Sequence, residues 1–149
     1  GYSIDFENPS NADFSTNDSF RFVMFLNNFS IALHKVNKKL IVAVDPAYNG
    51  IPNSMLFWYI YHPVIPLYAD YYAIMAYETF YMGNYSFQEA VNSIISSTGQ
   101  YLTKAQIMII LSDINYSTNM PFTMEDLNLR INYTLKNGIK AIPILRDIQ

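Results

Sequence analysis

The chain begins with Gly1-Tyr2-Ser3-Ile4-Asp5-Phe6-Glu7, a stretch with the pattern of a buried β-strand that ends in two carboxylates. Asp5 and Glu7 are two positions apart, so an extended backbone points both side chains the same way. When two carboxyl groups lie on one buried wall, each pushes the pKa of the other away from its own, so that one can act as a general acid while the other stabilises charge. Asp-x-Glu also occurs on strand faces that are simply exposed to solvent. The choice between a catalytic pair and a solvated face therefore depends on the rest of the sequence.

Strand and helix patterns alternate along the chain. Apolar runs predict five strands, at residues 1–7, 40–44, 70–78, 107–111 and 139–145. Helical spacing and capping residues predict a helix from about 19 to 39, a short one over 55–61, one between Ser86 and Gly99, and one between Thr123 and Gly138. The first helix is expected to turn one apolar stripe inward, formed by Phe22, Phe25, Leu26, Phe29, Leu33 and Val36.

This order of strands and helices predicts an α/β fold, a parallel sheet with helices outside it. Open doubly wound sheets and closed (β/α) barrels share this pattern, and both place their chemistry at the carboxyl ends of the strands. Those ends bear most of the polar side chains near the strands, namely Asp5, Glu7, Asp45, Tyr77, Glu78, Asp113, Asn115, Arg146 and Asp147.

Composition excludes several classes of function. With 149 residues, 51% of them hydrophobic and 14% charged, the chain can form one globular domain of ordinary size. A net charge of -3 gives no basic field, which argues against nucleic acid as a partner. The apolar run at 55–61 is too short to span a bilayer. There is no Cys, and His34 and His62 are isolated, so we expect neither a metal site nor a cofactor.

Asn-x-Ser/Thr motifs occur five times, where chance would give roughly two. They start at Asn17, Asn28, Asn84, Asn115 and Asn132. The excess favours a glycoprotein that is extracellular or on the cell surface. A chain rich in Asn, Ser and Thr also produces such motifs by chance, and this alternative stays open.

The polar strand ends resemble those of the family 18 glycoside hydrolases, the chitinase-like (β/α) barrels. The fourth strand of that family ends in Asp-x-x-Asp-x-Asp-x-Glu, and residues 3–7 match its last five positions except at Ser3. The resemblance implies that Glu7 protonates the leaving glycosidic oxygen. It also implies that Asp5 orients the acetamido group of the substrate, whose carbonyl oxygen attacks the anomeric carbon, so that no nucleophilic carboxylate is needed.

Two further segments extend the resemblance. The stretch from Phe25 to Val44 is similar to the helix and fifth strand of the family, and Met75-Ala76-Tyr77-Glu78 is similar to the Met-x-Tyr-Asp end of its sixth strand. Tyr77 would then donate a hydrogen bond to the acetamido oxygen, and Glu78 stands where Asp is usual. Further candidates for substrate binding are Glu78, Asp45, Trp58, Asp113 and Arg146, although Trp58 in its apolar run also suits a core position.

The resemblance implies that the five strands are the fourth to eighth of an eight-stranded TIM barrel. Residues 1–149 would be the C-terminal part of one barrel domain, partnered by the remaining barrel segment from the same or an associated chain. The expected function is a glycoside hydrolase, chitinase-like or endo-N-acetylglucosaminidase-like, acting on β-linked N-acetylhexosamine glycans with retention.

Two departures keep other functions open. Ser3 replaces an Asp of the family, and no counterpart is found for the Trp that usually forms the floor of the sugar site. The alternatives are a non-catalytic glycan-binding or structural extracellular protein on the same scaffold, and an unrelated doubly wound binding domain.

Overall fold

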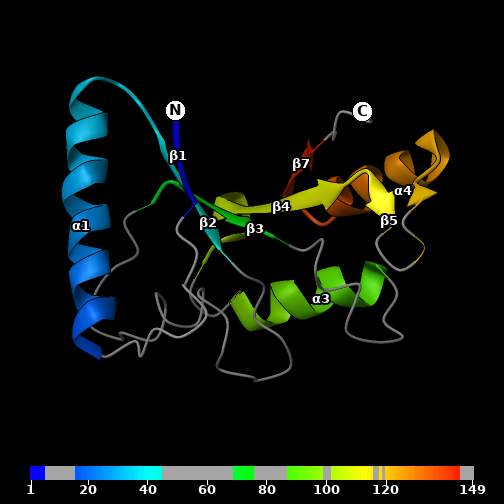
Figure 1. Ribbon diagram of the computed structural model, residues 1–149, viewed down its shortest axis with the longest axis horizontal. Helices are drawn as coiled ribbons and strands as arrows, with labels where there is room; N and C mark the ends of the chain where they lie inside the picture. Colours follow the sequence, from blue (N-terminus) through cyan, green and yellow to red (C-terminus); the bar gives the residue numbers. More distant parts are fainter. Residues whose placement is uncertain are drawn as a thin grey trace.

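The computed structural model describes residues 1–5, 16–44, 69–75, 87–98, 102–115, 118 and 120–144. In it, five parallel strands form one sheet in the order β1-β2-β3-β4-β7. Their bounds confirm the five predicted strands: β1 Tyr2–Asp5, β2 Leu40–Val44, β3 Tyr71–Ile74, β4 Ile107–Ser112 and β7 Lys140–Ile144. In Figure 1 the sheet extends from β1, beside α1, to β7, beside α4.

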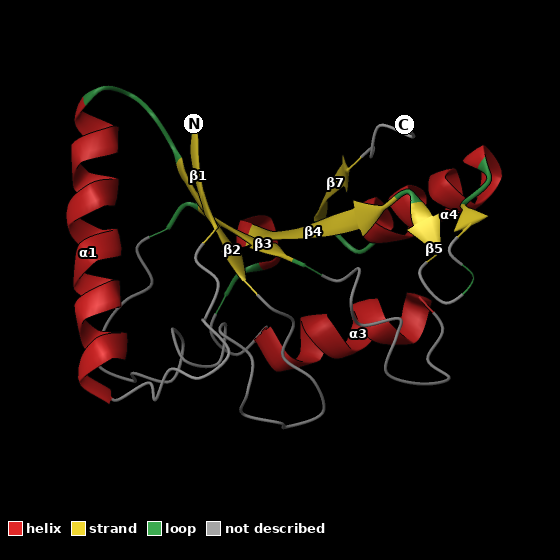
Figure 2. Ribbon diagram, viewed as in Figure 1, coloured by secondary structure: helices red, strands yellow, loops and turns green. Residues whose placement is uncertain are grey.

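The helices that the structure describes accompany the sheet (Figure 2). They are α1 Thr16–Lys35, α3 Phe87–Thr98 and α4 Met124–Lys136, with a 3-10 turn, η2, at Lys104–Gln106. Thr123 caps α4 as predicted, because its Oγ accepts a hydrogen bond from the Asp126 amide at 3.1 Å. The short helix predicted over 55–61 lies outside the described residues. Among the described helices, none has the length and apolar character needed to cross a membrane.

The first helix ends four residues earlier than the predicted Lys39. Asn37 adopts a left-handed conformation with φ 55°, and the Lys38 amide donates to the Leu33 carbonyl at 2.9 Å. This is a Schellman motif, which satisfies the last carbonyls of a helix and turns the chain away. The end of α4 is built the same way, with Gly138 at φ 77° in the position where the sequence predicted it.

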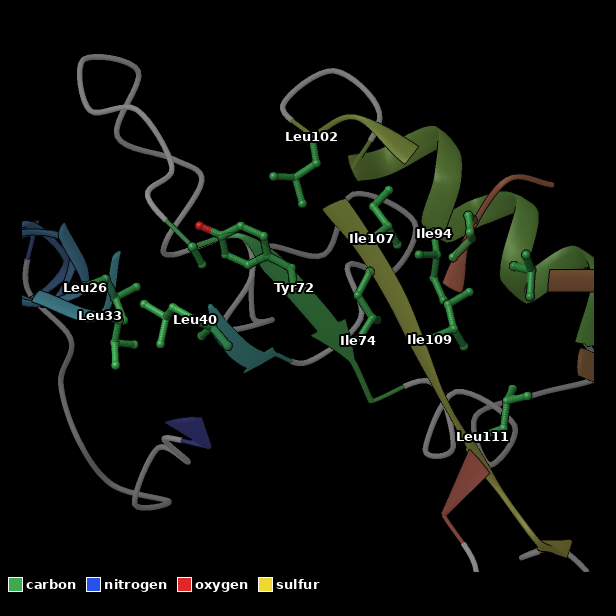
Figure 3. Close-up of a cluster of buried hydrophobic side chains, with 14 residues drawn as sticks. Leu26, Leu33, Leu40, Tyr72, Ile74, Ile94, Leu102, Ile107, Ile109 and Leu111 are labelled. Atoms are coloured by element: carbon green, nitrogen blue, oxygen red, sulfur yellow. The ribbon is translucent and has the colours of Figure 1, made fainter. Parts of the chain in front are cut away.

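All three helices pack on one face of the sheet. Leu40 and Val42 of β2 and Tyr72 of β3 lie on this face, with Leu26 of α1 and Ile94 of α3 against them. Figure 3 shows the two ends of this cluster, with Leu26 and Leu33 of α1 beside Leu40, and Ile94 of α3 beside Ile107 and Ile109 of β4. This cluster is the main hydrophobic core, and burying it is the main force that holds helices and sheet together.

The inward stripe predicted for α1 is partly wrong. The residues that α1 buries are Val23, Leu26, Ser30 and Leu33, whereas Phe25 is 51% exposed, and Val36, just beyond the helix, is 63% exposed. The apolar surface of α1 is therefore wider than the stripe that rests on the sheet. Its buried stripe is rotated away from Phe25, and one apolar flank of the helix is left uncovered by the described residues.

The opposite face of the sheet has a second, smaller cluster. Ala43, Ala73 and Ile110 of the sheet are buried there together with Met75, which directly follows β3, and none of the described helices contributes to this cluster. We call it the inner face, because it lies away from the helices. In the row of residues in register with Asp5, its side chains are small in β2 and β3, at Ala43 and Ala73, and larger in β4, at Met108.

Two further features differ from expectation. The first strand is not buried: Tyr2, Ser3 and Asp5 are exposed, because β1 pairs with β2 and forms one edge of the described sheet. A short antiparallel hairpin, β5 Ile114–Asn115 with β6 Met120–Pro121, was not predicted. Strands of two residues are too short to show an apolar period.

Candidate active site

The carboxyl ends of the strands lie along one edge of the sheet, because all five strands are parallel. Asp5 is in register with Ala43, Ala43 with Ala73, and Ala73 with Met108. Residues in register on parallel strands point to the same side of a sheet. The Asp5 carboxylate therefore lies on the inner face, at the carboxyl end of β1.

The inner face beside Asp5 is lined by two small side chains. Ala43 and Ala73 project little above the backbone, whereas Met75 and Ile110 follow towards the carboxyl ends of β3 and β4. A carboxylate beside a low apolar floor is a combination that can orient a polar ligand. Sequence reasoning did not single out the two alanines. Their signal was a single alanine within each of two strand runs of larger residues, Leu40-Ile41-Val42-Ala43-Val44 and Tyr71-Tyr72-Ala73-Ile74.

Asp113 follows β4 at the same end of the sheet, as predicted. Its carbonyl oxygen accepts a hydrogen bond from the Phe122 amide at 2.8 Å, and its Oδ1 is shielded from solvent. These contacts place Asp113 at the base of the β5–β6 hairpin. Three strand spacings separate β1 from β4, roughly 14 Å across the sheet, so Asp5 and Asp113 line the same rim without touching.

Six other site candidates lie outside the described residues: Glu7, Tyr77, Glu78, Asp45, Trp58 and Arg146. Among the sequons, Asn17 and Asn28 are in α1, Asn115 is in β5, Asn132 is in α4, and Asn84 is outside the described part of the chain. Asn28 and Asn132 are exposed.

A cation that sequence reasoning did not single out lies on the inner face. Lys140 is in register with Met108 and places its ammonium nitrogen 3.6 Å from the centre of the Tyr71 ring. The same nitrogen lies 3.5 Å from the Ala105 carbonyl oxygen. Tyr71 and Lys140 are the first residues of β3 and β7, so this cation–π pair lies at the amino ends of the strands, away from Asp5.

The amino ends of the strands hold a separate polar cluster around Asp70. Its carboxylate accepts hydrogen bonds from Lys39 Nζ at 2.8 Å and from the Leu40 amide at 2.9 Å, and His34 Nε2 lies 2.9 Å from Oδ2. Partial burial raises the pKa of Asp70, but the bonds from Lys39, Leu40 and His34 outweigh it and lower the pKa to about 2. The hydrogen bond to Asp70 raises the pKa of Lys39.

This cluster has a structural role. It joins the end of α1 to the starts of β2 and β3. These are the amino ends of the strands, whereas the candidate site lies at the carboxyl ends. Over the ranges that the structure describes, no three His, Asp or Glu side chains meet in a way that could hold a metal ion. The Asp5 surface is thus the site that combines an exposed acidic group with a preformed floor.

Comparison with known proteins identifies the fold. No family model matches the chain, and no curated protein matches it. Among solved structures, the PgaB (BpsB) glycoside hydrolase domain from Bordetella bronchiseptica has a TM-score of 0.56 at 12% identity and covers 87% of this chain. A chitinase from Chromobacterium violaceum has a TM-score of 0.57 at 22% identity over 74% of this chain. A class V chitinase from Pseudomonas fluorescens has a TM-score of 0.54 at 20% identity over 85% of this chain.

The similarity covers only part of each of these structures. The chain spans 39% of the PgaB domain, 35% of the Chromobacterium chitinase and 40% of the Pseudomonas chitinase. Identities this low establish the fold and leave the chemistry open. The chain has the fold of part of a chitinase-like (β/α) barrel, a five-stranded parallel α/β half of a TIM barrel.

Proposed function

We propose that this chain belongs to a glycoside hydrolase that cleaves β-linked N-acetylhexosamine glycans with retention. The observation that supports this most is the position of Asp5, on the inner face at the carboxyl end of β1, beside the floor of Ala43 and Ala73. In (β/α) barrels this end of the strands bears the catalytic groups. The likeness in fold to solved chitinases supports the same assignment.

The proposed roles follow the sequence spacing. Glu7 comes two positions after Asp5, and Tyr77 two positions after Met75 on the inner face. Glu7 would protonate the leaving oxygen and then activate water, while Asp5 would orient and stabilise the acetamido group as its oxygen attacks. Tyr77 would donate a hydrogen bond to that group. Contacts to the sugars would come from Glu78, Asp45, Trp58, Asp113 and Arg146.

Ser3 favours a second candidate function. Ser3 is in register with Ile41 and therefore faces the same side of the sheet as Asp5. In the family this position is an Asp, whose carboxylate shares a proton with the residue that corresponds to Asp5. The hydroxyl of Ser3 cannot take that role, which weakens the proposed chemistry. The second candidate is a glycan-binding or structural extracellular protein that has the same scaffold and inner face but does not hydrolyse glycans.

Turnover of a chromogenic chitobiose or chitotriose substrate by the complete protein tests the first function. We expect hydrolysis with retention, and Glu7→Gln should lower the rate at least about a hundredfold. Glu125→Gln, on the exposed first turn of α4, is the matched control and should leave the rate unchanged. Equal rates in Glu7→Gln and the control would exclude Glu7 as the acid. Glycan binding without any turnover would favour the second function.

We further propose that residues 1–149 form the C-terminal part of a single barrel domain, completed by β-α units from the same or an associated chain. Its strands β1 and β7 are the two edges of the described sheet. Solved structures with this fold are more than twice as long as the matched part. Uncovered parallel sheet edges invite pairing with another chain, so a partner on them is physically favoured.

We also propose an extracellular or cell-surface glycoprotein with at least two of the five sequons modified. Asn115, in the β5–β6 hairpin, is the best placed of the described ones. The hydroxyl residues of two others, Ser30 and Thr134, are buried, so those motifs are accessible only before their helices form. Mass spectrometry of the protein from its natural source tests this, and five unmodified asparagines would remove the support for this location.

A further inference from the structure

We propose that the amino ends of the strands form a lysine face that binds the surface of an anionic lipid bilayer. The lysine face is defined by all six lysines of the chain, Lys35, Lys38, Lys39, Lys104, Lys136 and Lys140. It lies at the end of the sheet opposite to the candidate active site. Such binding would hold the protein with the Asp5 end of the sheet away from the lipid, and it does not depend on the proposed hydrolysis.

Every one of these lysines belongs to a connection that leads into a strand. Three lie at the turn from α1 to β2, one lies in the 3-10 turn before β4, and two lie on either side of the turn from α4 to β7. The strands are all parallel, so these connections meet at one end of the sheet. Five of the six lysines are exposed, and Lys140 is half-buried.

Contacts across the sheet join the three groups of lysines. Lys39 Nζ lies 2.8 Å from Asp70 Oδ1, at the start of β3. The next residue, Tyr71, has its ring centre 3.6 Å from Lys140 Nζ. Lys140 Nζ is in turn 3.5 Å from the carbonyl oxygen of Ala105, in the 3-10 turn. The lysines of the three connections therefore border one continuous surface.

Positive and negative charge are separated along the strands. Asp70 is the one acidic residue that the described ranges place at the amino ends, and Lys39 and His34 both contact its carboxylate. The other acidic residues of those ranges lie at carboxyl ends of strands or in the first turns of helices, namely Asp5, Asp18, Glu89, Asp113, Glu125 and Asp126. The net charge of -3 thus conceals an end of the molecule with six lysines and one carboxylate.

Favourable helix ends account for only part of this pattern. A cation stabilises the carboxyl end of a helix, which explains Lys35 and Lys136 in the last turns of α1 and α4. Lys38 and Lys104 lie outside the α-helices, and both are exposed. Ammonium groups gathered at one end of a molecule repel one another, so this concentration favours a negatively charged partner.

Two exposed apolar side chains favour lipid as that partner. Val36 is 63% exposed between Lys35 and Lys38, and Leu135 is 53% exposed beside Lys136. A bilayer offers such side chains its acyl boundary, whereas a soluble polyanion has no apolar phase. An ammonium group is a hydrated point charge that suits diffuse attraction to headgroups, and each lysine near an anionic bilayer strengthens binding about fivefold.

Vesicle sedimentation with the complete protein tests the proposal. We expect binding to vesicles of phosphatidylcholine and phosphatidylglycerol in equal parts, and none to phosphatidylcholine alone. Raising the salt concentration from about 0.1 M to about 1 M shortens the screening length from about 10 Å to about 3 Å and should release the protein. Lys104→Gln should weaken binding about fivefold, and Lys104→Gln combined with Lys38→Gln about 25-fold.

Arg21→Gln is the matched control for the lysine variants. Arg21 is exposed on α1, but it lies roughly 21 Å along the helix from Lys35, beyond the screening length at about 0.1 M salt. This variant should bind the vesicles as the natural protein does. Val36→Ser separates lipid from a soluble anion. It should weaken vesicle binding at least about threefold and leave binding to dextran sulfate, a soluble polyanion, unchanged.

Several outcomes would overturn the proposal. They are equal binding to neutral and anionic vesicles, equal affinities of the lysine variants and the Arg21→Gln control, and an undiminished vesicle affinity of Val36→Ser. Binding to dextran sulfate without binding to vesicles would overturn it in favour of an acidic polysaccharide. Loss of chitotriose hydrolysis with vesicle binding retained would count against the enzyme assignment only.

Discussion

Asp70→Asn is the substitution whose effect the structure defines best. The Asp70 carboxylate receives three contacts, from Lys39, His34 and the Leu40 amide, across 30 to 36 residues of sequence. Asparagine keeps an oxygen that can accept from the Leu40 amide but loses the charge. The variant therefore separates the electrostatic part of this cluster from its packing and backbone hydrogen bond.

The expected magnitude follows from the pKa of Asp70. The pKa is lowered from 3.8 to about 2, and about 1.4 kcal/mol per pKa unit gives an upper bound of about 2.5 kcal/mol. Lys39 and His34 are 62% and 49% exposed, so water screens their attraction for the carboxylate. We expect about 1 kcal/mol of unfolding free energy to depend on the Asp70 charge.

The pH dependence distinguishes charge from packing. A folded-state pKa below the unfolded value means that the stabilisation is complete above about pH 3.8 and is lost as the pH falls towards 2. Urea unfolding of the natural protein and of Asp70→Asn should therefore differ by about 1 kcal/mol at pH 6 and converge near pH 2. Asp5→Asn, at an exposed position, should change stability by less than about 0.5 kcal/mol. A difference for Asp70→Asn that stays constant from pH 6 to pH 2 would refute the electrostatic explanation.

Three further substitutions test other parts of the fold by urea unfolding. Gly138→Ala should cost about 1 kcal/mol through backbone strain, because Gly138 has φ 77° and the added Cβ meets only Lys104 Cδ, at an ordinary contact distance of 3.8 Å; no cost would mean that the turn relaxes. Arg130→Met should cost about 1 kcal/mol, since the guanidinium lies 3.9 Å from the Phe122 ring centre and 4.9 Å from that of Phe87; an unchanged stability would show that the rings gain only from apolar contact. Tyr72→Phe should change stability by less than about 1 kcal/mol, because burial removes the Tyr72 hydroxyl from water and the Ala69 backbone offers it a single hydrogen bond in return; a larger loss would show that this hydrogen bond outweighs the cost of burial.

The strands and helices of the fold could be predicted because their signals are local. Apolar runs such as Leu40–Val44 identify strands, and Thr123 and Gly138 mark the two ends of α4 through hydrogen bonds within one turn. The order of elements then predicts a parallel sheet, and the chemistry is expected at its carboxyl ends. Asp5 lies at such an end, and this part of the site was predictable from sequence.

Other features depended on contacts between distant segments. Whether Phe25 faces the core or the solvent depends on how α1 rests on the sheet, and the helical period of the sequence is compatible with both. Asp70 pairs with residues more than 30 positions away, which no local pattern specifies. The first strand has an apolar pattern, yet it is exposed because burial depends on neighbouring strands and not on its own residues.

The sequence by itself therefore determined the order of the described sheet strands and helices, the two ends of α4 and the place of Asp5 at a strand end, since hydrogen bonds and apolar periods act within a few residues. Only the tertiary structure decided the register that sets Asp5 beside Ala43 and Ala73, and the exposure of Phe25 on α1 and of Tyr2 on the edge strand β1. Register and exposure depend on which surfaces meet in space, and that is fixed by packing the whole sheet against its helices.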